Sequence, residues 1–350
     1  MDFPDLCSPD GPGAVRADYW QMGLLPRRPL PVSPVDPALG ILSRSYARAG
    51  QDAEVGFYTS LQAAMSGKPH HKLHMGYVYI GYVDTIKNSE GYFYRTSDGW
   101  FVRGDEVTPV AYKDHSVPDQ FSGFELAEPP VHPFGWVLPA EGVYPSRTPG
   151  GKADKHAGFL ARYTAVEVFD SQKVDQDTWY MVGINQWILQ TRLGLIFPNT
   201  VRPDAIPVGV KWISINLFEQ TLTAYEGDRM VFVTLVASGL PGFWTRPGTF
   251  QTQKKYEIQT MSGSFEQDKA DYYYVGDVPW VMYFDRARAI HGEYWHNNLG
   301  AKHSHGCVNV PVADAHWLFN WAPSGTWVNV YDPSGKTPTD DKYYLNDAGI

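Results

Sequence analysis

The most regular alternation of apolar and polar positions in the chain begins near residue 208. Ile213, Ile215 and Leu217 occupy every second position, which predicts a half-buried strand. A hairpin is expected next, with strands at 222–225 and 230–237 around a turn at 226–228. The second run is apolar on both faces and therefore predicts a central strand of a sheet.

A helical period is convincing only once, near the C-terminal end. Its residues follow the spacing i, i+3, i+4 and i+7, with members Val312, Ala315, His316 and Phe319. Pro311 suits the first turn of such a helix, and Pro323-Ser324-Gly325 would end it. Residues 327–331 predict a last strand, and the polar residues after 332 are expected to be peripheral.

Two aromatic hairpins indicate an internal repeat in the first half of the chain. Strands at 92–94 and 100–102 flank one polar turn, and strands at 179–181 and 187–189 flank another. Trp187 follows Trp100 at an offset of 87 residues, and runs at 77–82 and 163–169 predict a strand before each hairpin. The Pro-rich stretch AEPPVHPFG separates the two, so we predict two small β modules.

Composition agrees with this reading and excludes some classes of protein. The chain holds 33 Gly and 27 Pro among 350 residues, which suits many short strands joined by turns. The net charge of −9 comes without any basic stripe, so the sequence does not predict a nucleic-acid binder. No run approaches the roughly 20 apolar residues of a transmembrane helix.

The first 45 residues predict a Pro-rich, extended lead-in. The start, MDFPDLCSPDGPG, lacks the charged and apolar regions of a secretory signal, so a protein that works outside the membrane would have had its signal removed. Cys7 offers a lipid-attachment alternative, although Leu6 is a poor match for the small residue expected before it. A disulfide between Cys7 and Cys307 would block thiol chemistry, so two cysteines fit one working thiol and one incidental residue.

The chemistry-bearing segment is His291-Gly292 followed by Ser304-His305-Gly306-Cys307. A thiol is a nucleophile as thiolate, and a nearby imidazole or helix N-terminus favours that form. Both are expected near Cys307, because the predicted helix begins about four residues later. Backbone N–H groups of the Gly306-Cys307 turn could serve an oxyanion, and Gly306 permits a tight approach there.

Three histidines are candidate bases for this thiol, namely His291, His303 and His305. We favour His291, because a strand-like run at 286–290 would hold it rigidly, with His305 lining the same pocket. No carboxylate stands out as a third member, so the carbonyl of Gly292 is expected to orient the imidazole. The alternatives are a loop without function and a zinc site formed by these histidines with His296 and Cys307.

The motif His-Gly…Ser-His-Gly-Cys-x-Asn resembles the signature of the L,D-transpeptidase (YkuD) catalytic domain. The resemblance extends over about 208–332, through 211–222, through Ala237-Ser238-Gly239 with 245–250, and through 278–284. The two β modules resemble bacterial SH3-like modules. Together these imply a mainly β protein, with two SH3-like barrels followed by a YkuD-type sandwich or barrel and one packed helix. The expected divisions are 1–45, 46–125, 126–203, 204–334 and a polar tail at 335–350.

The resemblance implies roles for individual residues. Cys307 would be the nucleophile and His291 the proton acceptor and donor, while the oxyanion and substrate-binding set would comprise Gly292, Ser304, His305, Gly306, Asn309 and Tyr283. Many members carry Arg where this chain has Asn309, and Asn offers a substrate only neutral hydrogen bonds. Residues 251–276 are expected to form a lid or a plain surface loop. Trp280, Tyr283 and Trp295 would line the substrate channel, with core packing favoured for Trp280.

The implied activity is peptidoglycan cross-linking in the wall or periplasm, in the service of cell-wall biogenesis and cell shape. Cys307 would attack the L,D amide of a stem tetrapeptide, release D-Ala and pass the acyl group to an amine, giving a 3→3 cross-link. The resemblance also implies acylation by carbapenems, no metal or organic cofactor, and glycan strands as partners of the SH3-like modules. The alternatives are an L,D-carboxypeptidase, with water as acceptor, and a non-catalytic wall-binding protein.

Overall fold

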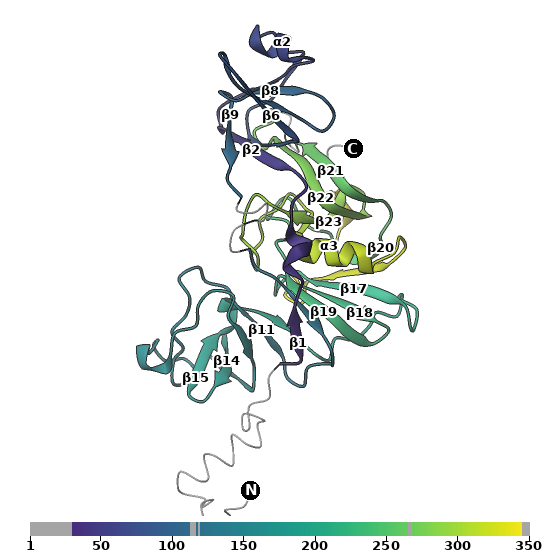
Figure 1. Cartoon of the computed structure of the whole chain (residues 1–350). Coiled ribbons are helices and arrows are strands. Elements are labelled where there is room, and N and C mark those ends of the chain that lie inside the picture. Colours follow the sequence, from purple (N-terminus) through teal and green to yellow (C-terminus); the bar gives the residue numbers. More distant parts are fainter. Residues whose placement is uncertain (1–29, 113–116, 118–119, 265, 267, 345–350) are drawn as a thin grey trace, which may run out of the picture. The chain divides into compact units, whose positions relative to one another are not determined.

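The computed structural model describes residues 30–112, 117, 120–264, 266 and 268–344. Residues 1–29 of the predicted lead-in, which include Cys7, lie outside the described residues. Strands account for most of the regular structure, which confirms the predicted mainly β fold (Figure 1). The chain divides into two compact units, one from Met1–Pro34 with Phe124–Leu235 and the other from Val35–Gly123 with Val236–Ile350.

The first unit contains a sheet in the order β1-β10-β19-β18-β17 and two three-stranded sheets, β12-β11-β16 and β13-β14-β15. Its elements are β1 (Val32–Pro34), β10 (Phe124–Leu126), β11 (Phe134–Val137), η3 (Lys155–Ala157), β12 (Ala165–Glu167), β13 (Asp170–Val174), β14 (Asp177–Gly183), β15 (Gln186–Leu189), η4 (Gln190–Arg192), β16 (Leu193–Ile196), β17 (Lys211–Asn216), β18 (Thr221–Glu226) and β19 (Arg229–Leu235).

The predicted hairpin after residue 208 is confirmed, since β18 pairs with both β17 and β19. The central position predicted for β19 is also confirmed, because it lies between β18 and β10. The half-buried character predicted for β17 is wrong. Ser214 and Asn216 are 4% and 6% exposed, and the Trp212 ring stacks on Tyr225 with centroids 4.2 Å apart. Both faces of β17 are therefore covered.

The second unit contains a sheet in the order β24-β23-β22-β5-β2-β9, with β21 also paired to β22, and the smaller pairings β3-β4, β6-β7-β8 and β20-β25. Its elements are η2 (Pro37–Gly40), β2 (Ser45–Ala49), β3 (Val55–Phe57), α2 (Leu61–Met65), β4 (His71–Leu73), β5 (Tyr77–Tyr82), β6 (Asp84–Asn88), β7 (Gly91–Arg95), β8 (Phe101–Arg103), β9 (Val107–Val110), β20 (Gly248–Gln251), β21 (Lys255–Gly263), β22 (Tyr273–Asp285), β23 (Arg288–Glu293), β24 (Val308–Pro311), α3 (Val312–Trp321), β25 (Trp327–Tyr331) and η5 (Asp341–Tyr344).

The helix predicted near the end is confirmed as α3, with Pro311 at its N-cap, and the last strand is confirmed as β25. It is not the only helix, because α2 follows Ser60, whose hydroxyl accepts a hydrogen bond from the Ala63 N–H. Two expectations about flanking segments are corrected. Part of the lead-in forms β1 and η2. The C-terminal tail is not wholly peripheral, because Tyr344 is 1% exposed.

Both predicted aromatic hairpins are present. Tyr94 pairs with Val102 across β7 and β8, and Tyr180 pairs with Ile188 across β14 and β15. Each hairpin is part of a three-stranded antiparallel sheet, and no closed barrel occurs in the described part of the chain. The strand before the first hairpin, β5, pairs in parallel with β22, so residues 77–79 join the sheet that also contains β23 and β24.

Glu219 gives the first unit an expected dependence of stability on pH. The residue is 4% exposed, and its carboxylate accepts from the Leu195 N–H at 3.0 Å. Burial raises the pKa of Glu219 to about 7, so the folded protein binds the carboxyl proton more tightly than the unfolded chain. The contribution of this proton to the free energy of unfolding is complete below the ordinary pKa of 4.5 and is lost as pH rises through 7. We expect Glu219→Gln to stabilise the protein relative to wild type at pH 8 by up to about 3 kcal/mol, and much less at pH 5.

Thermal unfolding of both proteins from pH 5 to pH 8 measures this difference. A difference that stays constant over the range would contradict ionisation of Glu219 as its cause.

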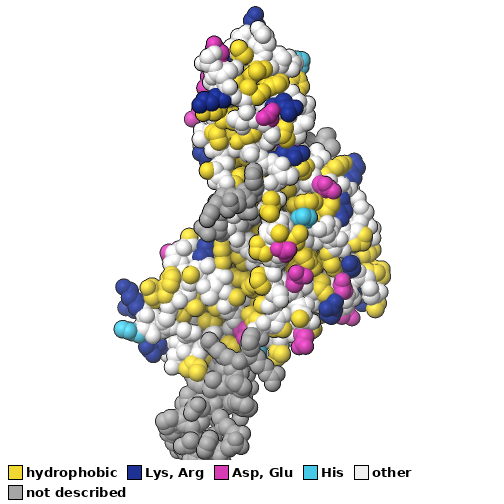
Figure 2. Space-filling view, in the orientation of Figure 1, with side chains coloured by type: hydrophobic (Ala, Val, Ile, Leu, Met, Phe, Trp, Pro, Cys, Tyr) yellow, Lys and Arg dark blue, Asp and Glu magenta, His cyan; other side chains and the backbone are white. Residues whose placement is uncertain are grey.

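Charged side chains of both signs are interspersed on the face shown in Figure 2. None of the helices in the described residues has the length and apolar character that a membrane crossing requires.

Candidate active site

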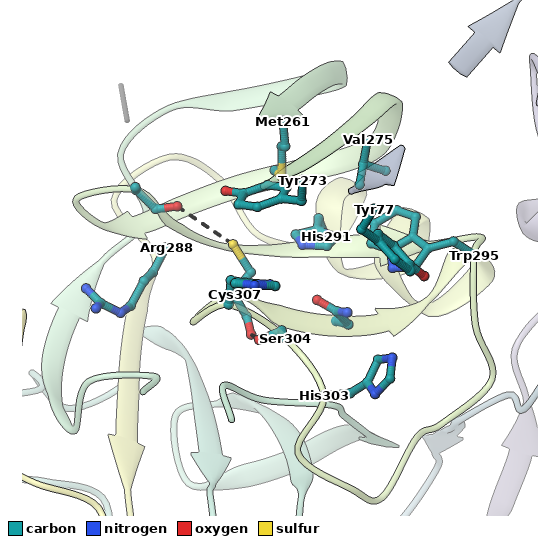
Figure 3. Close-up of a pocket in the computed structure, with 13 residues that line it drawn as sticks. Tyr77, Met261, Tyr273, Val275, Arg288, His291, Trp295, His303, Ser304 and Cys307 are labelled. Atoms are coloured by element: carbon teal, nitrogen blue, oxygen red, sulfur yellow. Dashed lines mark hydrogen bonds between the residues drawn. The ribbon is translucent and has the colours of Figure 1, made fainter. Parts of the chain in front are cut away.

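The second unit contains a cavity of about 260 Å3 beside strands β22, β23 and β24 of its main sheet (Figure 3). The elements that line it are β5, the β21–β22 hairpin, β23 and the loop that leads into β24. The lining side chains are mostly aromatic, apolar or histidine, and comprise Tyr77, Met261, Tyr273, Val275, Ala287, Arg288, His291, Trp295, His303, Ser304, His305, Cys307 and Asn309.

Strand register brings Cys307 and His291 into this one cavity. Parallel β23 and β24 place His291 opposite Asn309, and Cys307 lies two residues before Asn309. Side chains two apart along an extended chain share a face, so both point to the side on which His291 lies. The Cys307 thiol is 3.7 Å from the Ala287 carbonyl oxygen, the contact drawn in Figure 3.

The turn before Cys307 is shaped by Ser304 and Gly306. The Ser304 hydroxyl donates to the Cys307 carbonyl oxygen at 2.5 Å and accepts from the Gly306 N–H at 3.1 Å. Gly306 has a φ of +113°, and an added Cβ would approach the Arg288 Nε at 3.3 Å. The tight approach expected at Gly306 is therefore present. For the Gly306 N–H to bind an oxyanion, its hydrogen bond to the Ser304 hydroxyl would have to break.

Residues 238–245 form hydrogen bonds with the backbone of this turn. The Ser238 carbonyl accepts from the N–H groups of His303 and Ser304, at 2.8 and 3.0 Å. The Thr245 hydroxyl accepts from the Gly239 N–H and donates to the Gly306 carbonyl, both at 2.9 Å. The segment with the Ser-Gly…Thr motif thus fixes the backbone on which Cys307 sits.

His291 is a buried base candidate with one nitrogen already engaged. It lies within β23, is 2% exposed, and its Nδ1 is 3.1 Å from the Gly292 carbonyl oxygen, the orienting contact expected from the sequence. Donation from Nδ1 leaves Nε2 as the acceptor nitrogen. Burial lowers the pKa of His291 to about 4, against a smaller opposite effect of Gly292. The imidazole is therefore neutral at pH 7 and able to accept a proton.

One arginine that lines the cavity, Arg288, was missed in the sequence. Arg288 is 5% exposed and donates to the Trp244 carbonyl at 3.0 Å and to Asp285 at 3.2 Å. Asp285 also accepts two hydrogen bonds from Arg246, at 2.9 and 2.5 Å. The buried Asp285 thus holds Arg288 in the pocket wall. Spacing alone gave no sign that Arg246 and Asp285 meet.

Other predicted residues are distributed around the cavity. His305 and Asn309 line it, whereas Tyr283, on β22, does not, although burial and the neighbouring Cys307 raise the pKa of Tyr283 to about 12. Trp295 lines the cavity. Trp280 does not, because its ring stacks on His316 with centroids 3.7 Å apart, in agreement with core packing.

The segment 251–276 is neither a plain loop nor an independent flap. Half of its residues form β21 and the start of β22, and the two strands pair along Lys255–Gly263. Met261 and Tyr273 of this hairpin line the cavity, so it forms one wall. The sequence correctly predicted that this segment lies at the pocket. It did not predict that the segment forms a pair of hydrogen-bonded strands.

One feature expected near Cys307, the helix N-terminus, lies elsewhere in the structure. Strand β24 separates Cys307 from α3, and four extended residues span roughly 13 Å, so the helix N-terminus does not adjoin the thiol. In addition, the described residues contain no group of three His, Cys, Asp or Glu side chains placed to hold a metal ion.

Sequence reasoning did not assign Tyr77, Glu293 or His296 to the surroundings of the catalytic pair. Tyr77 reaches the cavity from β5, and its position depends on the parallel pairing with Tyr273. Glu293 and His296 form a buried pair behind Asn309, with 3.1 Å between Oε2 and Nδ1. His296 was considered only as a zinc ligand. Its position three residues after Glu293 could have suggested that the two side chains interact.

A mainly β unit with a cysteine, a buried neutral histidine and a Ser-His-Gly-Cys turn in one cavity defines a candidate cysteine acyl-transfer site. Residues 210–330 match the family model described as YkuD, the L,D-transpeptidase catalytic domain. This confirms the catalytic-domain family suggested by the sequence motif. A further relative is YciB of Bacillus subtilis (strain 168), which carries the name of an L,D-transpeptidase. It is 26% identical over 136 residues, which cover 33% of this chain and 63% of YciB.

Solved structures with similarity include two L,D-transpeptidases. One, from Xylanimonas cellulosilytica DSM 15894, is 28% identical, with 37% of this chain and 65% of that chain covered and a TM-score of 0.30. The other, from Enterococcus faecium, is 25% identical, with 39% and 55% covered and a TM-score of 0.33. The chain thus spans less than two thirds of the length of these relatives.

Proposed function

We propose that this protein is a peptidoglycan L,D-transpeptidase in which Cys307 is the nucleophile and His291 the general base. The observation that carries the proposal is the shared cavity of these two side chains, within the segment that matches the L,D-transpeptidase catalytic domain. The resemblance supplies the substrate class, a stem tetrapeptide that ends in D-Ala.

In the first step the Cys307 thiol transfers its proton to His291 Nε2, and the sulfur attacks the carbonyl carbon of the amide between the third and fourth residues. The C–N bond then breaks, the proton passes from His291 to the leaving nitrogen, and D-Ala departs. A thioester on Cys307 remains. A neutral imidazole is needed at the outset, and the depressed pKa of His291 provides it at neutral pH.

In the second step an amine of another stem attacks the thioester carbonyl. His291 takes a proton from that amine and returns one to the departing sulfur, which restores the thiol and leaves a 3→3 cross-link. Water as the acceptor would give an L,D-carboxypeptidase by the same steps. The cavity favours transfer, because its lining is largely aromatic and apolar, with Tyr77, Tyr273 and Trp295 among its walls.

The remaining expectations follow from this activity. The substrate places the protein outside the cytoplasmic membrane, and the thiol would be acylated by carbapenems. The three-stranded sheets β6-β7-β8 and β13-β14-β15 are the candidate SH3-like modules for glycan strands. In the second of them, Trp179 and Trp187 contribute to a cavity that Tyr144 also lines, a surface suited to sugar rings.

The test is mass spectrometry of the protein incubated with disaccharide-tetrapeptide, wild type beside Cys307→Ala. Dimers that lack one D-Ala, formed only when Cys307 is present, would support the transpeptidase. Tripeptide alone would indicate the carboxypeptidase. If neither product forms and a carbapenem adds no mass to Cys307, the catalytic proposal fails and the wall-binding alternative takes its place.

A further inference from the structure

The cavity that contains Cys307 has an aromatic wall residue from outside the segment that matches the catalytic domain. This residue is Tyr77, the first of β5, whereas the match covers residues 210–330. Tyr77 is half-buried, and the four residues that follow it in β5 are buried. Because Tyr77 lines the cavity, the uncovered part of its side chain is available to a ligand there.

The backbone at Tyr77 is fixed against β22. The Tyr77 N–H donates to the Tyr272 carbonyl at 3.0 Å, and Tyr77 pairs with Tyr273 in parallel register. Gly76 has a φ of +147°, and an added Cβ there would collide with the Tyr272 carbonyl oxygen. Glycine permits this close approach, so the chain enters β5 at a defined point. Tyr77 and Tyr273 therefore present their side chains on one face of the sheet, where both line the cavity.

The Tyr77 ring belongs to a row of aromatic rings that leads to Trp295. The ring centroids of Tyr77 and Tyr79 are 5.2 Å apart, and those of Tyr79 and Tyr294 are 6.0 Å apart. Tyr294 contacts Trp295 edge to face, with centroids 4.8 Å apart. In Figure 3, Tyr77 and Trp295 lie on the side of the cavity opposite Arg288. We call these two residues the aromatic side of the cavity.

The aromatic side offers a ligand no charge. Burial raises the pKa of the Tyr77 phenol, and interaction with Tyr79 adds to this, so the phenol stays neutral. The described residues that line the cavity include no Asp, Glu or Lys, and Arg288 is already bound by Asp285 and the Trp244 carbonyl. A charged group placed against the aromatic side would lose its hydration without gaining a partner. An apolar group would instead gain from leaving water.

The proposed reaction identifies the apolar group that reaches this place. Cys307 attacks the carbonyl carbon of the third residue of the stem, so the side chain of that residue enters the same cavity. A 3→3 cross-link requires an amine on this side chain, which is therefore an aliphatic chain with the amine at its end. The methylene groups of such a chain suit the face of an aromatic ring, whereas its charged end does not.

We propose that Tyr77 is a specificity-determining residue, whose ring binds, together with Trp295, the methylene groups in the third side chain of the donor stem. The inference rests on the proposed function, which places that side chain beside Cys307. It gives β5, a strand outside the matched catalytic segment, a part in the selection of the substrate.

The experiment measures binding in a Cys307→Ser background by calorimetry, so that no cleavage is needed. The probes are stem tetrapeptides that end in D-Ala and differ only in the third residue, which is lysine, norleucine or alanine. Norleucine keeps the aliphatic chain of lysine without its charge, and alanine has only a methyl group. The comparison of norleucine with alanine therefore isolates the methylene groups.

The Cys307→Ser protein should bind the norleucine and lysine stems about 10-fold more tightly than the alanine stem. Adding Tyr77→Ala should lower both preferences about 5-fold and leave the affinity for the alanine stem unchanged, because that stem has no methylene groups to lose. Tyr77→Gln keeps the bulk without the ring and should have the same effect, also if Tyr77→Ala does not fold. Tyr77→Phe keeps the ring and should keep both preferences. Tyr343→Ala, an exposed tyrosine of η5, is the matched control.

Preferences that survive both Tyr77→Ala and Tyr77→Gln, or an equal loss of affinity for all the stems, would overturn the proposal. So would a Cys307→Ser protein that binds the stems alike, or a loss in Tyr77→Phe as large as in Tyr77→Ala. A preference that depends on Tyr77, in a protein that forms no cross-linked product with Cys307 present, would remove the transpeptidase proposal and leave the Tyr77 site standing. Product formation with preferences indifferent to Tyr77 would have the opposite meaning.

Discussion

Replacing His291 by alanine is expected to lower kcat/KM for cross-link formation by roughly 10³-fold, the size of a lost general base. Wild type should lose activity as pH falls through about 4, because burial lowers the pKa of His291 to that value and a protonated ring cannot accept the thiol proton. Between pH 5 and 7 the wild-type rate should therefore show no loss from this group. The measurement is the pH profile of kcat/KM for the tetrapeptide donor.

The alanine variant should show no acid limb near pH 4. His156→Ala, an exposed histidine on η3 in the other unit, should match wild type and serves as the control. An acid limb near pH 6.5 in the wild type would argue against a buried His291 as the base.

Asp285→Asn is expected to produce the largest loss of stability among single changes near the site. The carboxylate is 3% exposed and binds Arg246 and Arg288, so its neutralisation leaves two arginines without their shared counter-charge. Removing one member of a buried ion pair typically costs 3–5 kcal/mol, and we expect about 3 kcal/mol because Arg246 is partly exposed. Urea unfolding of variant and wild type measures the difference.

Activity should fall as well, since Arg288 forms part of the wall beside Cys307. Asp340→Asn breaks an exposed pair with Lys342 and is the matched control, with an unfolding midpoint expected to equal that of wild type. Equal midpoints for Asp285→Asn and Asp340→Asn would show that the buried network does not stabilise the fold.

Local patterns were sufficient for most individual elements. The period of α3, the turn at 226–228 and the two aromatic hairpins depend on residues near one another in sequence, and all are present. Burial was harder to anticipate. Trp212 packs on Tyr225 of the next strand, so β17 is covered on the face that alternation assigned to solvent.

The sequence motif was enough to predict where the cavity lies. The residues that surround the motif in space could be identified only from the tertiary structure. Cys307, Ser304 and Gly306 are neighbours in the chain, and their turn could be anticipated from residue type. Contacts between distant segments could not, because they depend on how strands are ordered. Arg246 with Asp285 and Gln120 with Glu293 are separated by 39 and 173 residues. The role of Tyr77 likewise depends on a parallel pairing that no local period reveals.

The pairing of β5 with β22 brings Tyr77, from the N-terminal part of the chain, into the wall of the cavity that contains Cys307. A fragment cut near residue 204 would lose Tyr77, and the first three residues of β22 would lose their hydrogen-bonded neighbour on that side. Residues 77–79 are therefore part of the same structural unit as Cys307 and His291, although about 200 residues separate them in the chain. An insertion or substitution in β5 would alter the wall of the cavity that contains Cys307.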